Sequence, residues 1–159
     1  MQTFLPYESF EKSAQTLDWR RLGKQRVEGM QIINAITGKT RKDGKPYKGW
    51  INHPCSVMWK DYVPALKHYT NVFIQEWINR GYNNNMEFYD TGKIIMPDWI
   101  GNEKFHSSHR ANLLRKDFDY YSQFGWTENP ERPYVWHDKE KLWYEQQVGT
   151  GERIYLWVE

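Results

Sequence analysis

Residues 17–37 carry an apolar stripe at helical spacing. Val27, Met30 and Ile33 recur every three residues, which places them on one side of a helix. Gly38 follows the last residue of the run, where a left-handed glycine commonly ends a helix. The stripe therefore predicts one amphipathic helix from about Leu17 to Thr37. Two glycines inside it, at positions 23 and 29, would allow another backbone or a ligand to approach closely.

Prolines and glycines divide the rest of the chain into short elements, because proline suits a first helical turn and glycine a helix end. Residues 39–49 read as a loop. Residues 141–148 and 152–158 flank Gly149-Thr150-Gly151 and predict a β-hairpin. Short helices are expected at 9–14, from Pro54 to about Tyr62, from Pro64 to Gly81, after Gly101–Glu103, and after Asp117.

The fold class expected is mainly α, a single compact helical domain with a small C-terminal β-hairpin. The length of 159 residues suits one core. We expect the helical domain to cover residues 1–137 and the hairpin extension residues 138–159. Aromatic residues make up 17% of the chain, and half or more of these rings are expected in the core.

Several classes of protein are excluded by composition. The single cysteine, Cys55, excludes an intrachain disulfide scaffold and a cysteine-rich metal site. We expect no membrane span, since no apolar run reaches 18 residues. The first residues lack the features of a secretory signal, so a cytoplasmic location is expected.

Charge is distributed unevenly along the chain. Residues 19–50 contain nine basic residues and two acidic ones, a net charge of +7, whereas residues 127–159 carry −3. Such asymmetry is typical of a face that binds a polyanion. The alternative is an ordinary solvated helix face followed by a lysine-rich loop.

One group of candidate site residues lies in the predicted helix. Arg20, Lys24 and Glu28 are four residues apart and share one face, beside Arg21 and Gln25. Clustered arginines suit phosphate, and like charge on the two arginines would favour a neutral, nucleophilic Lys24. Glu28 would then act as a base or stabilise a developing cation. The alternative is a surface pair that contributes about 0.2–0.5 kcal/mol.

Two further groups contain histidine. Asn52 and His53 precede Pro54 at a predicted helix start, where phosphate binds readily, although His53 could simply cap the helix. His106, His109 and Arg110 lie within one helical turn and could contact phosphate or substrate, or could be ordinary surface histidines. Their spacing lacks the motif of a zinc protease, and neither a metal nor a cofactor is expected.

The order of these motifs resembles the phage-type pyrimidine-dimer DNA glycosylase (endonuclease V) family. The resemblance rests on Arg26-Val27-x-Gly29, the basic loop, Gly49-Trp50-Ile51-Asn52-His53-Pro54, Asn79-Arg80-Gly81-Tyr82 and the helix around His106–Lys116. A group of small phage and bacterial proteins with the signature R-R-L-G-K-Q-R-V-E is similar as well. The resemblance implies a helical domain in the cytosol of bacteria or phage-infected hosts that binds duplex DNA and flips a nucleotide. An amine then attacks the sugar C1′, and the resulting Schiff base can proceed to strand cleavage.

The sequence departs from the family at two positions. The family's amine is the N-terminus of a small residue exposed after methionine removal, whereas Gln2 is bulky, so that Met1 would supply the α-amine. Gly23 stands where the family has its glutamate. Either Lys24 and Glu28 have taken over these roles, or a related fold performs different chemistry.

We therefore expect a DNA N-glycosylase or glycosylase/AP lyase that acts on a damaged base of double-stranded DNA, as a monomer or a hairpin-mediated dimer. Lys24 is the candidate amine and Glu28 the candidate acid/base. A non-catalytic nucleic-acid-binding module and a nucleotide hydrolase or transferase are the alternatives. The expected DNA-binding residues are Arg20, Arg21, Gln25, Arg26, Arg41, Lys42, Lys45, Asn52, His53, His106, His109, Arg110 and Lys116.

Overall fold

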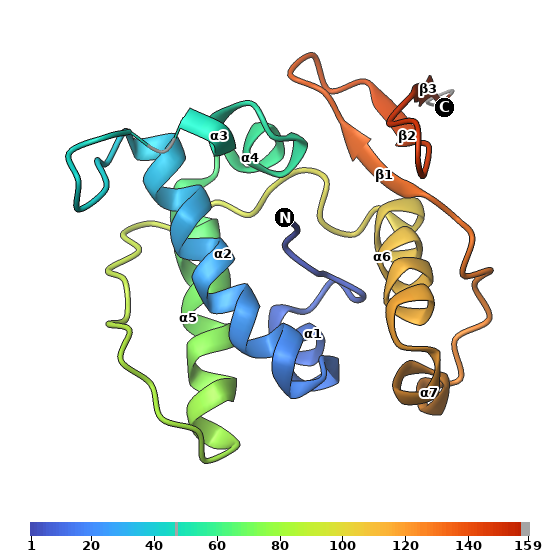
Figure 1. Ribbon diagram of the computed structural model, residues 1–159, viewed down its shortest axis with the longest axis horizontal. Helices are drawn as coiled ribbons and strands as arrows, with labels where there is room; N and C mark the ends of the chain where they lie inside the picture. Colours follow the sequence, from blue (N-terminus) through green and yellow to red (C-terminus); the bar gives the residue numbers. More distant parts are fainter. Residues whose placement is uncertain (47, 157–159) are drawn as a thin grey trace.

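The computed structural model describes residues 1–46 and 48–156, which form a mainly helical molecule with a small sheet near the C-terminus (Figure 1). This architecture confirms the fold class predicted from the sequence. The elements in chain order are α1 (Phe10–Thr16), α2 (Trp19–Thr37), α3 (Lys48–Ile51), α4 (Pro54–Trp59), α5 (Val63–Asn79), α6 (Glu103–Lys116), α7 (Phe118–Tyr121), the 3-10 helix η1 (Ser122–Phe124), β1 (Tyr134–His137), β2 (Trp143–Gln146) and β3 (Arg153–Tyr155).

The helix predicted at about 17–37 is confirmed as α2. Asp18 caps its N-terminus, where the Asp18 side chain accepts a hydrogen bond from the backbone N–H of Arg21. It ends at Gly38, which has a left-handed φ of 75°. Asn102 and Asp117 cap α6 and α7 in the same way as Asp18 caps α2, so the ends of these helices follow directly from local side chains.

Helices α2 and α5 pack closely because glycine lies at their contact. A methyl group on Gly29 would overlap Thr70, which is fully buried in α5 and donates its hydroxyl to the carbonyl of Leu66. A methyl group on Gly23 would lie 2.8 Å from the Trp77 ring. Both glycines therefore allow close approach of a neighbouring helix, one of the two roles expected for them.

The C-terminal part of the described chain forms an antiparallel sheet in the order β1-β2-β3. Strands β2 and β3 are the predicted hairpin, with Glu145 opposite Ile154. Strand β1, which the sequence did not predict, pairs with β2 and packs against α6. The boundary expected between residues 137 and 138 thus lies between two paired strands, and the division into domains stays a prediction.

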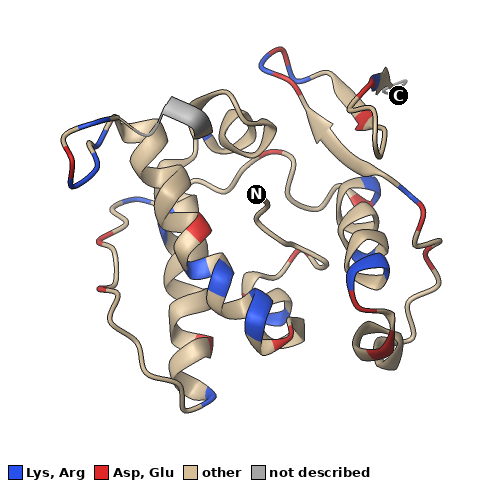
Figure 2. Ribbon diagram, in the orientation of Figure 1, with Lys and Arg blue, Asp and Glu red and all other residues tan. Residues whose placement is uncertain are grey.

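Basic residues form two separate groups along α2 (Figure 2). One lies in its first turns, and the other is the loop at 39–46, beyond the opposite end of the helix. Nineteen residues at a rise of about 1.5 Å make α2 roughly 28 Å long, so the two groups are well separated. Within the described ranges, no helix combines the length and apolarity that crossing a membrane requires.

Substitution of Gly29 by alanine is expected to destabilise the protein by about 1–3 kcal/mol, because the added methyl overpacks the α2–α5 contact. Urea denaturation measures this loss. The double variant Gly29→Ala/Thr70→Ala should recover part of it, since the shorter side chain makes room. If Gly29→Ala lowered the free energy of unfolding equally in the wild type and in the Thr70→Ala variant, the predicted contact between Gly29 and Thr70 would be contradicted.

Candidate active site

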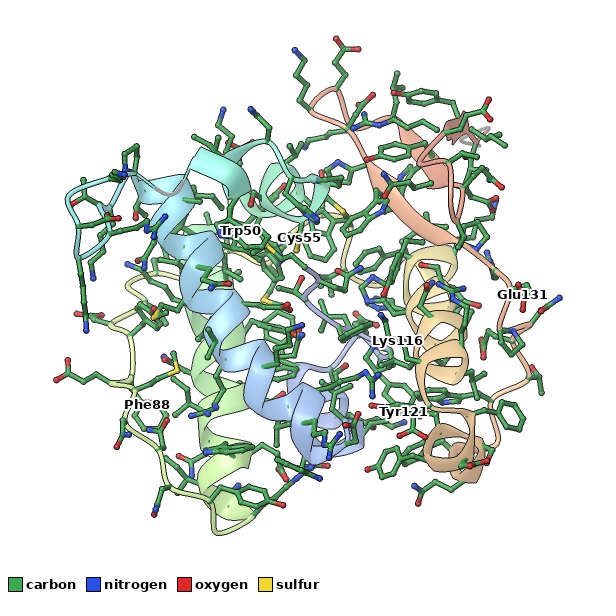
Figure 3. All side chains as sticks on the ribbon, in the orientation of Figure 1. Trp50, Cys55, Phe88, Lys116, Tyr121 and Glu131 are labelled. Carbon is green, nitrogen blue, oxygen red and sulfur yellow. The ribbon has the colours of Figure 1, made fainter. Side chains whose placement is uncertain are left out.

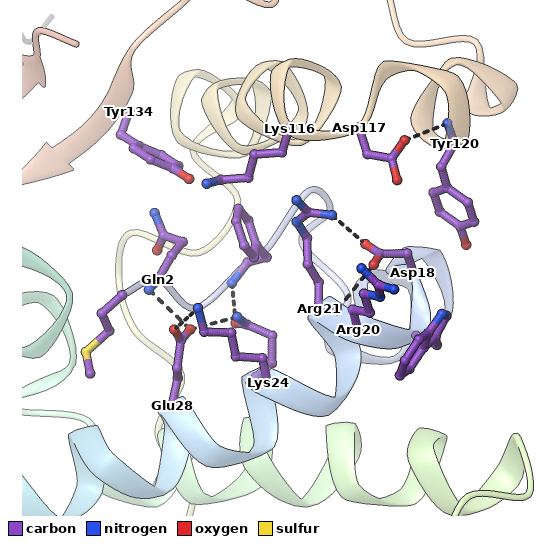
Figure 4. Close-up of a pocket in the computed structure, with 14 residues that line it drawn as sticks. Gln2, Asp18, Arg20, Arg21, Lys24, Glu28, Lys116, Asp117, Tyr120 and Tyr134 are labelled. Carbon is purple, nitrogen blue, oxygen red and sulfur yellow. Dashed lines mark hydrogen bonds and ion pairs between the residues drawn. The ribbon is translucent and has the colours of Figure 1, made fainter. Parts of the chain in front are cut away.

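A cavity of about 790 Å³ lies between the first turns of α2 and the junction of α6 with α7 (Figure 4). Most of the candidate residues on α2 face it, together with one lysine from α6. The lining residues are Met1, Gln2, Phe4, Asp18, Trp19, Arg20, Arg21, Lys24, Gln25, Glu28, Lys116, Asp117, Tyr120 and Tyr134. The structure therefore brings together Arg20, Arg21, Lys24, Gln25, Glu28 and Lys116 from the predicted site.

The floor of the cavity is the N-terminal segment, residues 2–6, which is buried between α2 and α6. Its backbone is hydrogen bonded by side chains. Gln25 Oε1 accepts from the N–H of Phe4 at 2.8 Å, and His109 Nδ1 accepts from the N–H of Leu5 at 2.9 Å. His106 Nδ1 lies 2.8 Å from the carbonyl of Leu5. These bonds fix the segment against both walls of the cavity.

Glu28 is a nearly buried carboxylate, with 7% of its surface exposed. Its Oε2 accepts hydrogen bonds from the backbone N–H of Gln2 at 3.3 Å and from Gln25 Nε2 at 2.9 Å. Its Oε1 lies 3.8 Å from the Nζ of Lys24. One oxygen is thus held by the protein, while the other faces an amine at the cavity.

The cations of the cavity differ in how they are paired. Arg21 forms an ion pair with Asp18 at 3.2 Å. Burial raises the pKa of Asp18, but hydrogen bonds from Tyr121 and Arg21 outweigh it and lower that pKa below its ordinary value. The guanidinium of Arg20 lies over the exposed Trp19 ring, and no carboxylate among the described residues pairs with it. Arg20 is therefore available to an anionic ligand.

Two arginines predicted to bind DNA make contacts within the protein instead of lining the cavity. Arg26 lies outside the cavity, where it stacks over Trp77 and donates to Asn84 Oδ1 at 2.8 Å. Arg110 pairs with Glu103 and with Glu128, and it donates to the carbonyl of Pro6. DNA contact by either residue stays a prediction, and these contacts give each a structural role.

The histidines of the α6 group are internal. His106 and His109 are almost completely buried and do not line the cavity. Burial lowers the pKa of both, and for His109 the neighbouring charges of His106 and Arg110 add to the effect. Their contacts with Leu5 make them anchors of the cavity floor.

The Asn52–His53 pair lies at the start of α4. Asn52 is exposed, and His53 caps the helix by accepting from the N–H of Cys55 at 3.1 Å. Burial and the positive charge of the chain's N-terminus lower the pKa of His53 to about 4. This supports the alternative in which a neutral histidine caps the helix. Arg41, Lys42 and Lys45 are exposed in the loop at 39–46, and their contact with DNA stays a prediction.

Position 23 faces away from the cavity. A Cβ there points at the Trp77 ring of α5, so a side chain at this position could not reach the amine or the floor. Glu28 occupies the cavity instead. Which of the two interpretations of the Gly23 departure holds stays a prediction.

A model of the pyrimidine dimer DNA glycosylase family matches residues 1–90, more than half of the chain. The chain belongs to this family. Comparisons with curated proteins and with solved structures gave no match. The family match covers the α2 wall and the floor of the cavity, whereas the α6 wall lies beyond it. Family membership supports a DNA-repair glycosylase function and makes DNA the substrate class.

Sequence reasoning missed several lining residues. The positions of Asp18 and Asp117 at helix starts can be predicted, because aspartate is a common N-cap residue. Nothing in the sequence, however, predicts that Tyr134 of β1 lies near the start of α2. Within residues 1–46 and 48–156, His, Cys, Asp and Glu side chains do not gather in threes that could hold a metal ion.

Buried neutral histidines make stability depend on pH. Their folded pKa values lie below 6.5, so the unfolded state binds more protons and stability falls as pH drops below about 6.5. We expect a slope of up to about 1.4 kcal/mol per pH unit for each histidine. Urea denaturation from pH 8 to pH 4 measures it.

His109→Gln is the matched variant, because glutamine can still accept from the N–H of Leu5 but does not titrate. In this variant the slope of unfolding free energy against pH should decrease by up to about 1.4 kcal/mol per pH unit, which corresponds to the loss of one titrating proton. An unchanged slope would show that His109 does not contribute to the pH dependence of stability.

Proposed function

We propose that this protein is a DNA glycosylase/AP lyase that acts on a damaged base, with Lys24 as the attacking amine and Glu28 as its acid/base partner. The observation that carries the proposal is the buried Glu28 carboxylate, which faces Lys24 Nζ at 3.8 Å in a cavity lined by cations. Family membership supports a pyrimidine dimer as the substrate.

The arrangement suits amine attack on a sugar. Glu28 Oε1 takes a proton from the Lys24 ammonium, and the freed electron pair of the amine forms a bond to C1′. The bond from C1′ to the base breaks, and its electron pair leaves with the base, which takes the proton that Glu28 removed from Lys24. Glu28 then removes a second proton from the attached nitrogen and passes it to O4′ as the C1′–O4′ bond breaks with its pair on O4′. The electron pair of the nitrogen forms the C1′=N bond, and the resulting iminium cation lies next to the Glu28 carboxylate, whose charge stabilises it.

The cations around the cavity suit the DNA backbone. Arg20 and Arg21 lie in the first turn of α2, and guanidinium groups bind phosphate oxygens bidentately. Exposed Trp19, beside them at the cavity, offers a ring on which a base can stack. A duplex held in this way would place one sugar over Lys24 and Glu28.

Borohydride trapping on duplex DNA with a natural abasic site tests the chemistry. The wild-type protein should give a covalent adduct, and Lys24→Ala should lose it. Glu28→Gln should slow trapping by about 10²–10⁴-fold, the usual range for an acid/base group. Peptide mapping of the adduct identifies the amine: an adduct on the peptide of residues 1–12 would assign the attack to the N-terminus and overturn the role of Lys24.

A protein that binds the duplex but neither forms an adduct nor releases a base would be a non-catalytic module. Release of dimer-containing bases from ultraviolet-irradiated DNA tests the pyrimidine dimer as the substrate. Exchange of Lys93 for glutamine, in the exposed loop outside the cavity, is the control and should leave trapping unchanged.

Salt dependence tests the phosphate contacts. Arg20→Gln should lower the slope of log affinity against log salt concentration by about one and weaken binding of all duplexes similarly. Fluorescence anisotropy from about 50 to 200 mM salt measures the slope. A slope that Arg20→Gln leaves equal to the wild-type value would exclude a phosphate contact by this residue.

A further inference from the structure

The α6 wall brings a second lysine into the cavity. Lys116 is the last residue of α6 and extends from the wall opposite Lys24 and Glu28 (Figures 3 and 4). In the described part of the chain its Nζ has neither a hydrogen bond nor an ion pair, whereas Lys24 faces the Glu28 carboxylate. Lys116 is therefore the cavity lysine without an ion-pair partner in the described part of the chain.

The surroundings of Lys116 disfavour its charged form. Partial burial of the amine lowers its pKa, and the cations Arg21, Arg115 and Lys24 lower it further, while Glu28 opposes them. Like-charged neighbours are a recognised means of making a lysine neutral near physiological pH. Other charged or titratable groups face it or line the same cavity: the α-amine of Met1, Asp18 at the start of α2, Arg20, Arg21, Lys24 and Glu28 of α2, Arg115 and Asp117 beside it, Tyr120 of α7 and Tyr134 of β1.

We propose that Lys116 is the base that removes the C2′ proton in the strand-cleaving step, an inference that rests on the proposed function. A sugar bound to Lys24 through an iminium lies between the two walls, and Lys116 is the second lysine that lines this space. The C2′–H bond breaks and its proton passes to Lys116 Nζ. The electron pair becomes the C2′=C3′ double bond, and the C3′–O bond breaks with its pair leaving on the phosphate.

Glu28 is less suited to this step. Its Oε2 already accepts two hydrogen bonds, and its Oε1 faces the nitrogen that becomes the iminium. A carboxylate in that position stabilises the cation. With a separate base on the opposite wall, Glu28 stabilises the iminium cation while Lys116 removes the C2′ proton.

The test uses the full chain and a duplex with a natural abasic site, and it measures strand cleavage relative to borohydride-trapped adduct. Lys116→Arg keeps the positive charge but cannot become neutral. We expect cleavage per adduct to fall about 10²–10⁴-fold in this variant. Lys104→Gln, an exposed lysine of α6 that does not line the cavity, is the control and should match the wild type.

A pH profile supplies a second readout. Cleavage per adduct by the wild type should rise with pH and level off below 10.5, the ordinary pKa of lysine, and Lys116→Arg should lose this rise. Normal cleavage by Lys116→Arg would show that the residue only holds phosphate and would overturn the inference, as would a wild-type adduct that never cleaves. Absence of any wild-type adduct would instead overturn the proposed function itself.

Discussion

The cavity depends on an extended segment that is buried without a strand partner. Backbone N–H and C=O groups in such a position must find other partners, and side chains from three helices supply them. Gln25 of α2 and His109 of α6 accept from Phe4 and Leu5, and Tyr69 of α5 donates to the carbonyl of Phe4. The segment thereby ties the α2–α5 layer to α6 and sets the distance between the two walls.

This constraint also positions Glu28. The N–H of Gln2 and the amide of Gln25 both donate to its Oε2, so the residues that fasten the segment also orient the carboxylate toward Lys24. A carboxylate fixed by backbone and amide donors is preorganised for a charge that develops beside it. The same side chains therefore hold both the floor of the cavity and the Glu28 carboxylate.

Charge pairing decides which basic residues remain available. Arg110 is bound by Glu103 and Glu128, the second of them from the acidic C-terminal region, and Arg26 stacks on Trp77. Arg20 and Lys116 have no carboxylate partner among the described residues, and both face the cavity. The basic residues named here are therefore either held in structural contacts or face the cavity, and those of the loop at 39–46 lie apart from both groups.

Local signals predicted much of the fold. The apolar stripe and Gly38 defined α2, and the spacing of Lys24 and Glu28 placed them on one face. Strand β1 and the α6 wall depend on contacts between distant residues, such as Val135 N–H with Ser108 Oγ, which no local pattern encodes. His106 and His109 looked like ligand contacts because helical spacing cannot tell whether a polar face meets solvent or a buried backbone.

Titration of the labelled protein with a short DNA duplex, followed by amide chemical shifts, tests the central claim most directly. A DNA-binding cavity between α2 and α6 predicts that the largest shifts fall on the first turns of α2 and on residues 115–120, which are far apart in sequence. Shifts confined to the C-terminal sheet or to residues 82–98 would show that DNA binds elsewhere and would contradict the account.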